Sequence, residues 1–470
     1  MQVRKKHLAQ LDCVINSVRI NLQQGLLVMF KHLLIMLVLL VSTTAQAALN
    51  IQHWTLENGA RVYFVENHSI PMLDVSIEFD AGARRDPKGK SGVAALTNSM
   101  LGRGVRSAKL PSGVDEPALT EAQISDAFAD IAAQRGGGPG VDRSGLSVRS
   151  LSSATEREQA ILLIARLLAH PSMPEDFLAR DKARSISGIK EAETKPESIA
   201  DKAFWRLAYG DHPYANESTV QSMSAITRED LLQFHAKHYV ANRAVIAMIG
   251  DISRAQADEI ARQLTARLPQ GGSLPSITPV VTPQAVEQRI PHPASQAHIV
   301  IGMPALQRGD ADVFPLTVGN YILGGGGFVS RLTKEVRVKR GLAYSVYSNF
   351  NAMEQLGPFK AGLQTRKDQA DEALKVVREQ ITTYLQTGPT EAELKAAKDN
   401  LIGGFALRID NNRKILDNIA VIGYYQMPLD YLDTWTTQVA KVTLADVRAA
   451  FNRKLAMDKI VTVVVGRENN

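Results

Sequence analysis

The feature that most constrains the fold of this chain is a segment that occurs twice, once near the middle and once at the end. The copies read "ITREDLLQFHAKHYVANRAVIAMIGDI" and "VTLADVRAAFNRKLAMDKIVTVVVGRE". A threonine, an aspartate and a glycine stand at the same spacing in both, as Thr227, Asp230 and Gly250, and as Thr443, Asp446 and Gly466. Each copy predicts a capped helix followed by a buried β-branched strand that ends at glycine. A repeat of this size indicates duplicated domains rather than a solenoid of short repeats.

A proline-rich segment separates the two predicted domains. Residues 269–293 hold six of the 20 prolines in the chain, a composition typical of an extended connector. We therefore predict an N-terminal domain over residues 48–268 and a C-terminal domain over residues 294–470. Strands and long helices alternate irregularly in both, which indicates the α+β class, with helices packed on a sheet in each domain.

Local signals predict several elements within these domains. The dipeptide Asn58-Gly59 between two apolar runs predicts a β-hairpin, followed by a further strand. Two pairs predict capping boxes at helix starts, namely Ser153 with Glu156, and Thr390 with Glu393.

Residues 1–47 resemble a secretory signal peptide. Lys31 precedes an apolar run over residues 33–41, and the small-residue site Ala45-Gln46-Ala47 follows. The run is too short to span a bilayer. Because 28 residues before Met29 make an unusually long leader, we expect the true start at Met29. These features predict export to a bacterial periplasm, with no membrane anchor after cleavage.

Charge and cysteine content exclude several classes of function. The formal charge of +6 falls to about +2 without the leader, and Lys and Arg form no cluster, so we expect no nucleic-acid partner. The single cysteine, Cys13, lies in the leader. The rest of the chain therefore offers no disulfide, no thiolate ligand and no cysteine nucleophile.

The common catalytic motifs are absent. We find no nucleophile elbow, P-loop or dinucleotide fingerprint. The segment "LGGGGFVSRL", residues 323–332, lacks the Lys-Ser/Thr of a phosphate loop and favours a tight turn packed against another backbone. His235 and His238 form the only close histidine pair, with Lys237 between them and no carboxylate nearby. This pattern favours a solvated helix face over a metal site.

Three long segments resemble a known family. They are "LENGARVYFVENHSIPMLDVSIEFDAGARRDPKGKSGVAALTNSMLGRG" (56–104) and residues 170–214 and 321–350. All three resemble the pitrilysin/insulinase zinc peptidases, which include the mitochondrial processing peptidases, and the resemblance extends over essentially the whole chain after the leader. It implies two duplicated helix-on-sheet domains of the mitochondrial processing peptidase-like metallohydrolase type, in agreement with the repeat.

The resemblance also implies that this chain has lost the zinc site of the family. Active members bind zinc through His-x-x-Glu-His on one helix, and the glutamate acts as general base. The corresponding positions here are Ala95, Asn98 and Ser99. A distal glutamate ligand corresponds to Gly188, with Glu191 as the alternative register. Residues 93–102 contain no His, Asp or Glu, so we expect no cofactor bound by this chain.

A second motif of the family is present. Active single-chain relatives use an arginine and a tyrosine seven residues apart to hold the substrate carbonyl and stabilise the oxyanion. Arg337 and Tyr344 have this spacing in "RVKRGLAY". The pair serves either this function or packing alone. A glycine turn before it is a candidate for admitting substrate, at Gly324, Gly325, Gly326 and Gly327.

The resemblance implies a non-catalytic, substrate-binding subunit of a periplasmic zinc metallopeptidase. In that hypothesis a separate subunit binds zinc, the two chains form a heterodimer, and Arg337 and Tyr344 act on the peptide across the interface. Peptide binds in the family by strand addition to a sheet edge. One alternative is a peptide-binding or scaffold protein of the same fold without a peptidase partner. Another is an independent metallopeptidase that uses His235 and His238.

Overall fold

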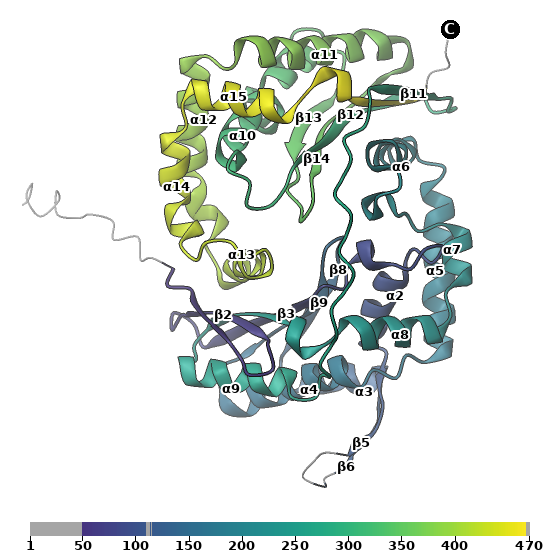
Figure 1. Cartoon of the computed structure of the whole chain (residues 1–470), viewed down its shortest axis with the longest axis vertical. Coiled ribbons are helices and arrows are strands. Elements are labelled where there is room, and N and C mark those ends of the chain that lie inside the picture. The colour runs from purple at the N-terminus through teal and green to yellow at the C-terminus, as the bar shows by residue number, and fades with distance from the viewer. Residues whose placement is uncertain (1–48, 110–112, 114, 467–470) are drawn as a thin grey trace, which may run out of the picture. The chain divides into compact units, whose positions relative to one another are not determined.

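The hairpin predicted at Asn58-Gly59 begins the first of the two large β-sheets (Figure 1). The computed structural model describes residues 49–109, 113 and 115–466, so the predicted signal peptide lies outside the described residues. From Asn50 onward the chain forms one compact unit. The first sheet has the order β1-β2-β10-β3-β9-β8. Its strands are β1 (Gln52–Thr55), β2 (Arg61–Glu66), β3 (Met72–Phe79), β8 (Gln134–Pro139), β9 (Ser144–Leu151) and β10 (Val245–Gly250).

The second sheet repeats the topology of the first. Its order is β11-β15-β12-β14-β13. Its strands are β11 (Val286–Ile290), β12 (Gln296–Leu306), β13 (Ser345–Phe350), β14 (Gly357–Arg366) and β15 (Val461–Val465). β15 is parallel to β11 and antiparallel to β12, as β10 is to β2 and β3. The predicted duplication is therefore confirmed for five strands of each sheet, with no counterpart of β1 in the second, and β11 lies within the proline-rich segment.

Eight α-helices of the first half and six of the second complete the described chain. Those of the first half are α2 (Val93–Met100), α3 (Glu121–Asp130), α4 (Ala154–Ala169), α5 (Glu175–Ala192), α6 (Pro196–Tyr209), α7 (Val220–Ala225), α8 (Arg228–His238) and α9 (Arg254–Thr265). Those of the second half are α10 (Val313–Asn320), α11 (Ala370–Thr387), α12 (Glu391–Gly403), α13 (Asn412–Tyr424), α14 (Tyr431–Lys441) and α15 (Leu444–Lys454).

Shorter elements connect them. The two-residue strands are β4 (Gly104–Val105), β5 (Ala108–Lys109), β6 (Asp115–Glu116) and β7 (Leu119–Thr120). The 3₁₀ and π turns are η1 (Ala83–Arg85), η2 (Pro213–Ala215), η3 (Ala241–Arg243), η4 (Tyr321–Gly325), η5 (Gly327–Val329), η6 (Thr333–Val338), η7 (Lys367–Gln369), η8 (Phe405–Arg408) and η9 (Met457–Lys459).

Local sequence explains several helix starts. The capping boxes in both copies of the repeat are formed, at the N-termini of α8 and α15, and so is the box of Thr390 and Glu393 at α12. The prediction for Ser153 is confirmed only in part. Its hydroxyl donates to Glu156, but no side-chain bond caps the backbone of α4. Each satisfied cap removes an unpaired N–H from a helix end and stabilises it by about 1 kcal/mol.

Alternation along the strands separates the two faces of the first sheet. On β3, Leu73, Val75, Ile77 and Phe79 point to one face and are buried in a core that includes residues of α2, α4, α8 and α9. Between them, Asp74 lies on the opposite face and pairs with Arg149 at 2.8 Å. One face of the sheet is thus covered by helices of its own half.

The opposite face of each sheet is covered by a helix from the other half of the chain. α6, from the first half, packs on β12 and β15, and its Phe204 ring approaches Gly302 so closely that a Cβ there would lie 3.1 Å from the ring. α13, from the second half, packs on β2, β3 and β10 (Figure 1). A Cβ at Gly423 of α13 would lie 2.6 Å from the Tyr63 ring. The two halves therefore exchange equivalent helices.

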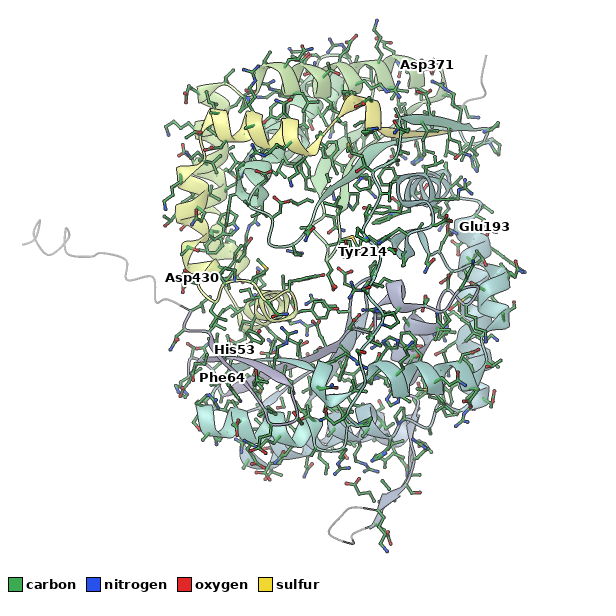
Figure 2. The ribbon with its side chains drawn as sticks, in the orientation of Figure 1. His53, Phe64, Glu193, Tyr214, Asp371 and Asp430 are labelled. Carbon is green, nitrogen blue, oxygen red and sulfur yellow. The ribbon has the colours of Figure 1, made fainter. Side chains whose placement is uncertain are left out.

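A buried polar network also joins the halves. The Asp142 carboxylate accepts hydrogen bonds from the hydroxyls of Tyr214, at 2.7 Å, and Tyr425, at 2.8 Å. The Tyr214 hydroxyl in turn accepts from the backbone N–H of Gln355 at 2.9 Å. Figure 2 labels Tyr214 between the two sheets. Since a buried carboxylate without donors is costly, these bonds fix how the halves meet.

No helix among the described residues combines the length and the apolar composition that crossing a bilayer requires.

Candidate functional site

The start of α2, the helix of the degenerate zinc positions, is held by an acidic side chain. Asp86 accepts hydrogen bonds from the backbone N–H groups of Gly92 and Ala94, both at 2.7 Å. Burial raises the pKa of the Asp86 carboxyl to about 6, against the opposing effect of the two N–H groups. Gly92 has φ +110°, where a side chain would be strained. Capping and packing within the chain thus position α2.

A cavity of about 420 Å³ lies between α2 and α5. Ala95 and Ser99, four residues apart on one face of α2, line it on one side. The α5 side is lined by Asp181, Arg184, Ser185 and Ile189. Gly188 lies on α5 beside these residues, and a Cβ there would meet no atom within 4 Å. The helices that would carry the metal ligands in the resembling family therefore face one cavity here.

Asn98 points away from that cavity into the core. Its side chain is buried, and Nδ2 donates to the carbonyl of Gly145 at 3.0 Å and lies 3.3 Å from the Tyr239 hydroxyl. Position 98, which corresponds to the general base of the family, has thus become part of the hydrogen bonding that joins α2 to the sheet.

The residues around the cavity do not fit a zinc ion. Zinc is held by His, Cys or carboxylate ligands, and Ala95 has no lone pair. The Ser99 hydroxyl donates to the Leu96 carbonyl at 2.9 Å. Glu191, the alternative for the distal ligand, is exposed and pairs with Lys195 at 2.7 Å. Across residues 49–109, 113 and 115–466, no three His, Cys, Asp or Glu side chains group in a way that could hold a metal ion.

Arg337 and Tyr344 lie together at a second cavity, of about 340 Å³. The Arg337 guanidinium carbon is 4.6 Å from the centroid of the Tyr344 ring and 4.8 Å from that of Phe328. Tyr344 is 78% exposed. Within the described chain, neither Arg337 nor Tyr344 makes a side-chain hydrogen bond or ion pair. Both therefore keep their donors available to a ligand, while two rings fix the guanidinium in place.

Phe328 is a site residue that sequence reasoning missed. It stands in the glycine turn, next to Gly327, and its ring is 68% exposed. The sequence signal that could have identified it is an aromatic residue directly after four glycines. Its contact links the glycine turn to Arg337.

Close packing and backbone conformation explain why glycines occupy this turn. A Cβ at Gly324 would lie 2.5 Å from the backbone nitrogen of Ser348 on β13, and one at Gly326 would lie 2.5 Å from the Tyr321 carbonyl oxygen. Gly327 has φ +58°. The turn is thus packed against another backbone, as its sequence predicted. Gly324, Gly325 and Gly327 line the cavity of Arg337, whereas Gly326 does not.

The prediction that His235 and His238 lie on a solvated helix face is wrong. Both side chains are buried on α8. His235 Nε2 donates to the Leu168 carbonyl at 2.7 Å, and His238 Nδ1 donates to the Asp80 carbonyl at 2.8 Å. Burial lowers the pKa of each imidazole to about 4. Both rings are neutral core residues whose donors already have partners.

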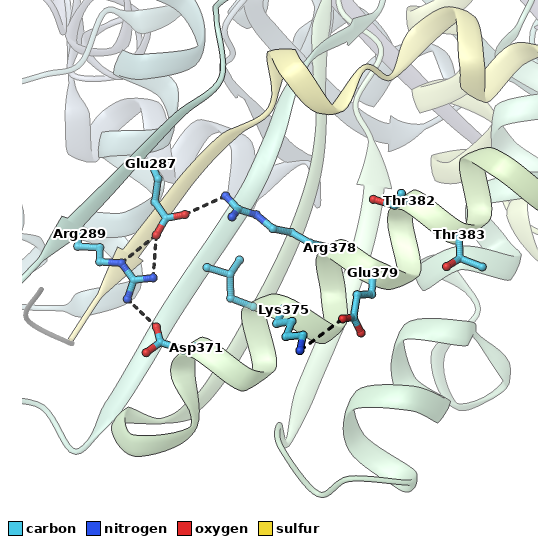
Figure 3. Close-up of a pocket in the computed structure, with 9 residues that line it drawn as sticks. Glu287, Arg289, Asp371, Lys375, Arg378, Glu379, Thr382 and Thr383 are labelled. Carbon is cyan, nitrogen blue, oxygen red and sulfur yellow. Dashed lines mark hydrogen bonds and ion pairs between the residues drawn. The ribbon is translucent and has the colours of Figure 1, made fainter. Parts of the chain in front are cut away.

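A cavity of about 480 Å³ between β11 and α11 has a different character (Figure 3). Glu287 pairs with Arg289 at 2.7 Å and with Arg378 at 2.9 Å, and Arg289 also pairs with Asp371 at 2.7 Å. Because acidic and basic side chains neutralise one another along its wall, this cavity offers no group aimed at a ligand.

Comparison with known proteins agrees with this geometry. Residues 225–401 match the family model described as "Peptidase M16 inactive domain". The crystal structure of a peptidase M16 inactive domain from Pseudomonas fluorescens is 38% identical, with a TM-score of 0.83, over 90% of this chain and 98% of that chain.

Two further proteins show how widely this fold occurs. The chain is 25% identical to the non-peptidase homolog YmxG of Helicobacter pylori, over 93% of this chain and 99% of that protein. The periplasmic protease PqqL of Escherichia coli is 17% identical, with a TM-score of 0.75, over 89% of this chain and 46% of PqqL, and shows the fold alone. The predicted family is confirmed, and the chain belongs to the peptidase M16 family as a member whose metal helix carries no zinc ligands.

Proposed function

We propose that this chain is the substrate-binding, non-catalytic subunit of a periplasmic M16 metallopeptidase and acts with a separate zinc-bearing subunit. The observation that carries the proposal is a contrast between the two halves. α2 has Ala95 and Ser99 where the family binds metal, whereas the half-buried Arg337 and the exposed Tyr344 stand at a cavity with free donors. A peptidase reaction that uses this chain thus needs a metal from another subunit.

The chemistry of Arg337 and Tyr344 suits a developing oxyanion. The guanidinium is a permanent cation, and the phenol is a neutral donor. Their cavity and the cavity beside α2 share no lining residue, so this chain does not combine the two parts of a peptidase site in one place. This separation supports action across a heterodimer interface. The leader sequence supports the periplasm as the compartment.

The test is to purify the chain from its native source, identify an associated chain with the intact zinc motif, and measure peptide hydrolysis by the complex. Tyr344→Phe removes one hydroxyl and keeps the ring against Arg337. We expect kcat to fall by about 10²–10³, the usual effect of losing one oxyanion donor, with assembly unchanged.

Tyr347→Phe is the matched control, because Tyr347 lines the same cavity and is 44% exposed. It should leave kcat unchanged. A Tyr344→Phe complex that cleaves peptide at the wild-type rate would assign Tyr344 to packing and favour a scaffold protein without a peptidase role. A zinc ion held by the isolated chain, with chelator-sensitive proteolysis, would contradict the proposal directly.

A further inference from the structure

The second sheet ends in an edge strand whose counterpart in the first sheet is covered. In the first sheet β1 pairs with β2, whereas β11, the equivalent of β2, pairs with β15 alone among the described residues. Accordingly Val62 and Phe64 of β2 are buried, while Val286 and Glu287 of β11 are exposed. β11 therefore lacks the antiparallel neighbour that β1 supplies in the first sheet.

The backbone of β11 shows which groups are directed at the place of the missing strand. The N–H of Val286 donates to, and the carbonyl of Ile290 accepts from, the residues that flank β15. Because this direction alternates along a strand, Glu287 and Arg289 direct their N–H and C=O groups away from β15. The residues in the same register of β2 pair with β1. Glu287 and Arg289 thus present the backbone groups that an added strand would use.

The side chains of this edge are complementary to those of a second copy of the same strand. β11 has the sequence Val-Glu-Gln-Arg-Ile. Antiparallel pairing about Gln288 sets Glu287 of each copy opposite Arg289 of the other, and Val286 opposite Ile290. The two neighbouring registers that use the same backbone groups would set Glu287 against Glu287, or Arg289 against Arg289. The charges therefore select a single register.

The surface beside the edge is electrically neutral, which favours a copy of this chain over a charged partner. The cavity between β11 and α11 is lined by equal numbers of acidic and basic side chains, namely Glu287, Asp371, Glu379, Arg289, Lys375 and Arg378. Their ion pairs alternate in sign along the wall (Figure 3). A second copy carries the same alternation and extends it across the edge, whereas a strongly acidic or basic surface would leave one sign unpaired.

We propose that two copies of this chain associate edge to edge through β11, in antiparallel pairing centred on Gln288, so that their second sheets form one continuous sheet. Each opposed pair of Glu287 and Arg289 exchanges an N–H and a C=O bond. Pro291, directly after the strand, has no N–H and ends the pairing there. The cavity beside β11 shares no lining residue with that of Arg337 and Tyr344, so this inference is independent of the proposed substrate-binding function.

The experiment measures self-association of the full chain without its leader by sedimentation velocity. We expect a reversible equilibrium of monomer and dimer between about 1 and 200 µM, the range in which small interfaces associate. Glu287→Arg and Arg289→Glu should each weaken dimerisation about tenfold, because two pairs of like charge replace two pairs of opposite charge. Lys395→Glu is the control, since it reverses an exposed cation on α12 and should leave the dimer unchanged.

A mixture of Glu287→Arg and Arg289→Glu tests the register itself. In a mixed dimer every opposed pair again has opposite charges, so the two variants should bind each other about as tightly as wild-type chains do. A folding defect in either variant cannot produce this gain. A wild type that stays monomeric, a dimer that neither variant weakens, or a mixture that associates no better than each variant alone would overturn the inference.

Discussion

At the scale of single residues, the three degenerate zinc positions have different environments. Ala95 and Ser99 line a cavity that has room for larger side chains, whereas Asn98 is 5% exposed and hydrogen-bonded in the core. The loss of metal ligands is therefore easily reversed at two positions. Position 98, which corresponds to the general base, is different, because the Asn98 side chain now makes a hydrogen bond that supports the core.

Asn98→Glu should destabilise the protein by about 2–4 kcal/mol. The amide donates to the Gly145 carbonyl, and a carboxylate at this place would set oxygen against oxygen and bury a charge. The free energy of unfolding, measured in urea, tests this expectation.

Gly188→Glu provides the matched control, because it also adds a carboxylate near the cavity. The Gly188 Cβ position is open, and glycine lowers helix stability within α5, so this variant should be as stable as the wild type or slightly more stable. If Asn98→Glu has the same free energy of unfolding as the wild type, the hydrogen bonds of Asn98 contribute nothing to stability.

At the scale of elements, α8 shows how burial changes the meaning of a sequence pattern. The pattern of His235, Lys237 and His238 suggests an exposed face, yet both rings pack inside, His235 against Tyr239 and His238 against Phe234. The His235 ring donates to the Leu168 carbonyl of α4, and the His238 ring donates to the carbonyl of Asp80, just after β3. These two hydrogen bonds hold α8 against the rest of its half.

The buried pair predicts acid sensitivity. Folding lowers the pKa of both histidines from 6.5 to about 4, so the unfolded chain binds protons that the folded chain does not. Stability should therefore fall as the pH decreases from about 6.5 to 4, with roughly 1–2 kcal/mol lost per histidine at pH 5. Unfolding in urea at several pH values measures this slope.

His235→Gln should reduce the slope, since a glutamine amide donates without titrating. His68→Gln is the control, because folding raises the pKa of His68 instead of lowering it. His68 is exposed, and hydrogen bonds to Asp251 and Glu66 raise its pKa, so its removal should leave the acid decline in place. An unchanged slope in His235→Gln would rule out this source of the decline.

At the scale of the whole molecule, the exchange of α6 and α13 joins the two halves. Gly423 of α13 lies against Tyr63 of β2, and its carbonyl accepts from Arg61 of β2 at 3.0 Å. Leu416 and Ile419 are buried seven and four residues before Gly423, a spacing that sets them on the same face of the helix. Each sheet is completed by a helix that lies beyond the connector in sequence, so the halves form one compact unit.

Cleavage of the connector should leave the halves together. A specific protease site inserted after Val281, which is 81% exposed, opens the chain between the exchanged helices. The two fragments should co-elute in gel filtration as one particle of the original size, since burial of the exchanged helices stabilises their association.

The cut Leu416→Asp variant should separate into its fragments, because it places a charge against the first sheet. Asp417→Ala, on the exposed side of the same helix, should remain together. Fragments of the wild type that separate on cleavage would show that the halves are independent domains.

The sequence by itself determined the features that depend on local chemistry. The duplication is visible because two segments share the same pattern of residues. The hairpin at Asn58-Gly59 and the boxes at Thr227, Thr390 and Thr443 depend on hydrogen bonds between residues close in the chain. The lack of zinc ligands in α2 is equally independent of the fold, since no packing gives alanine a lone pair.

Only the tertiary structure decided which surfaces meet. An apolar stripe on α6 or α13 shows that a helix is covered, but it does not show which sheet covers it, and the exchange between halves follows from topology. The burial of His235 depends likewise on contacts between elements distant in sequence. Such contacts leave no periodic pattern in the chain, because each residue contributes one side chain to a place that the whole fold creates.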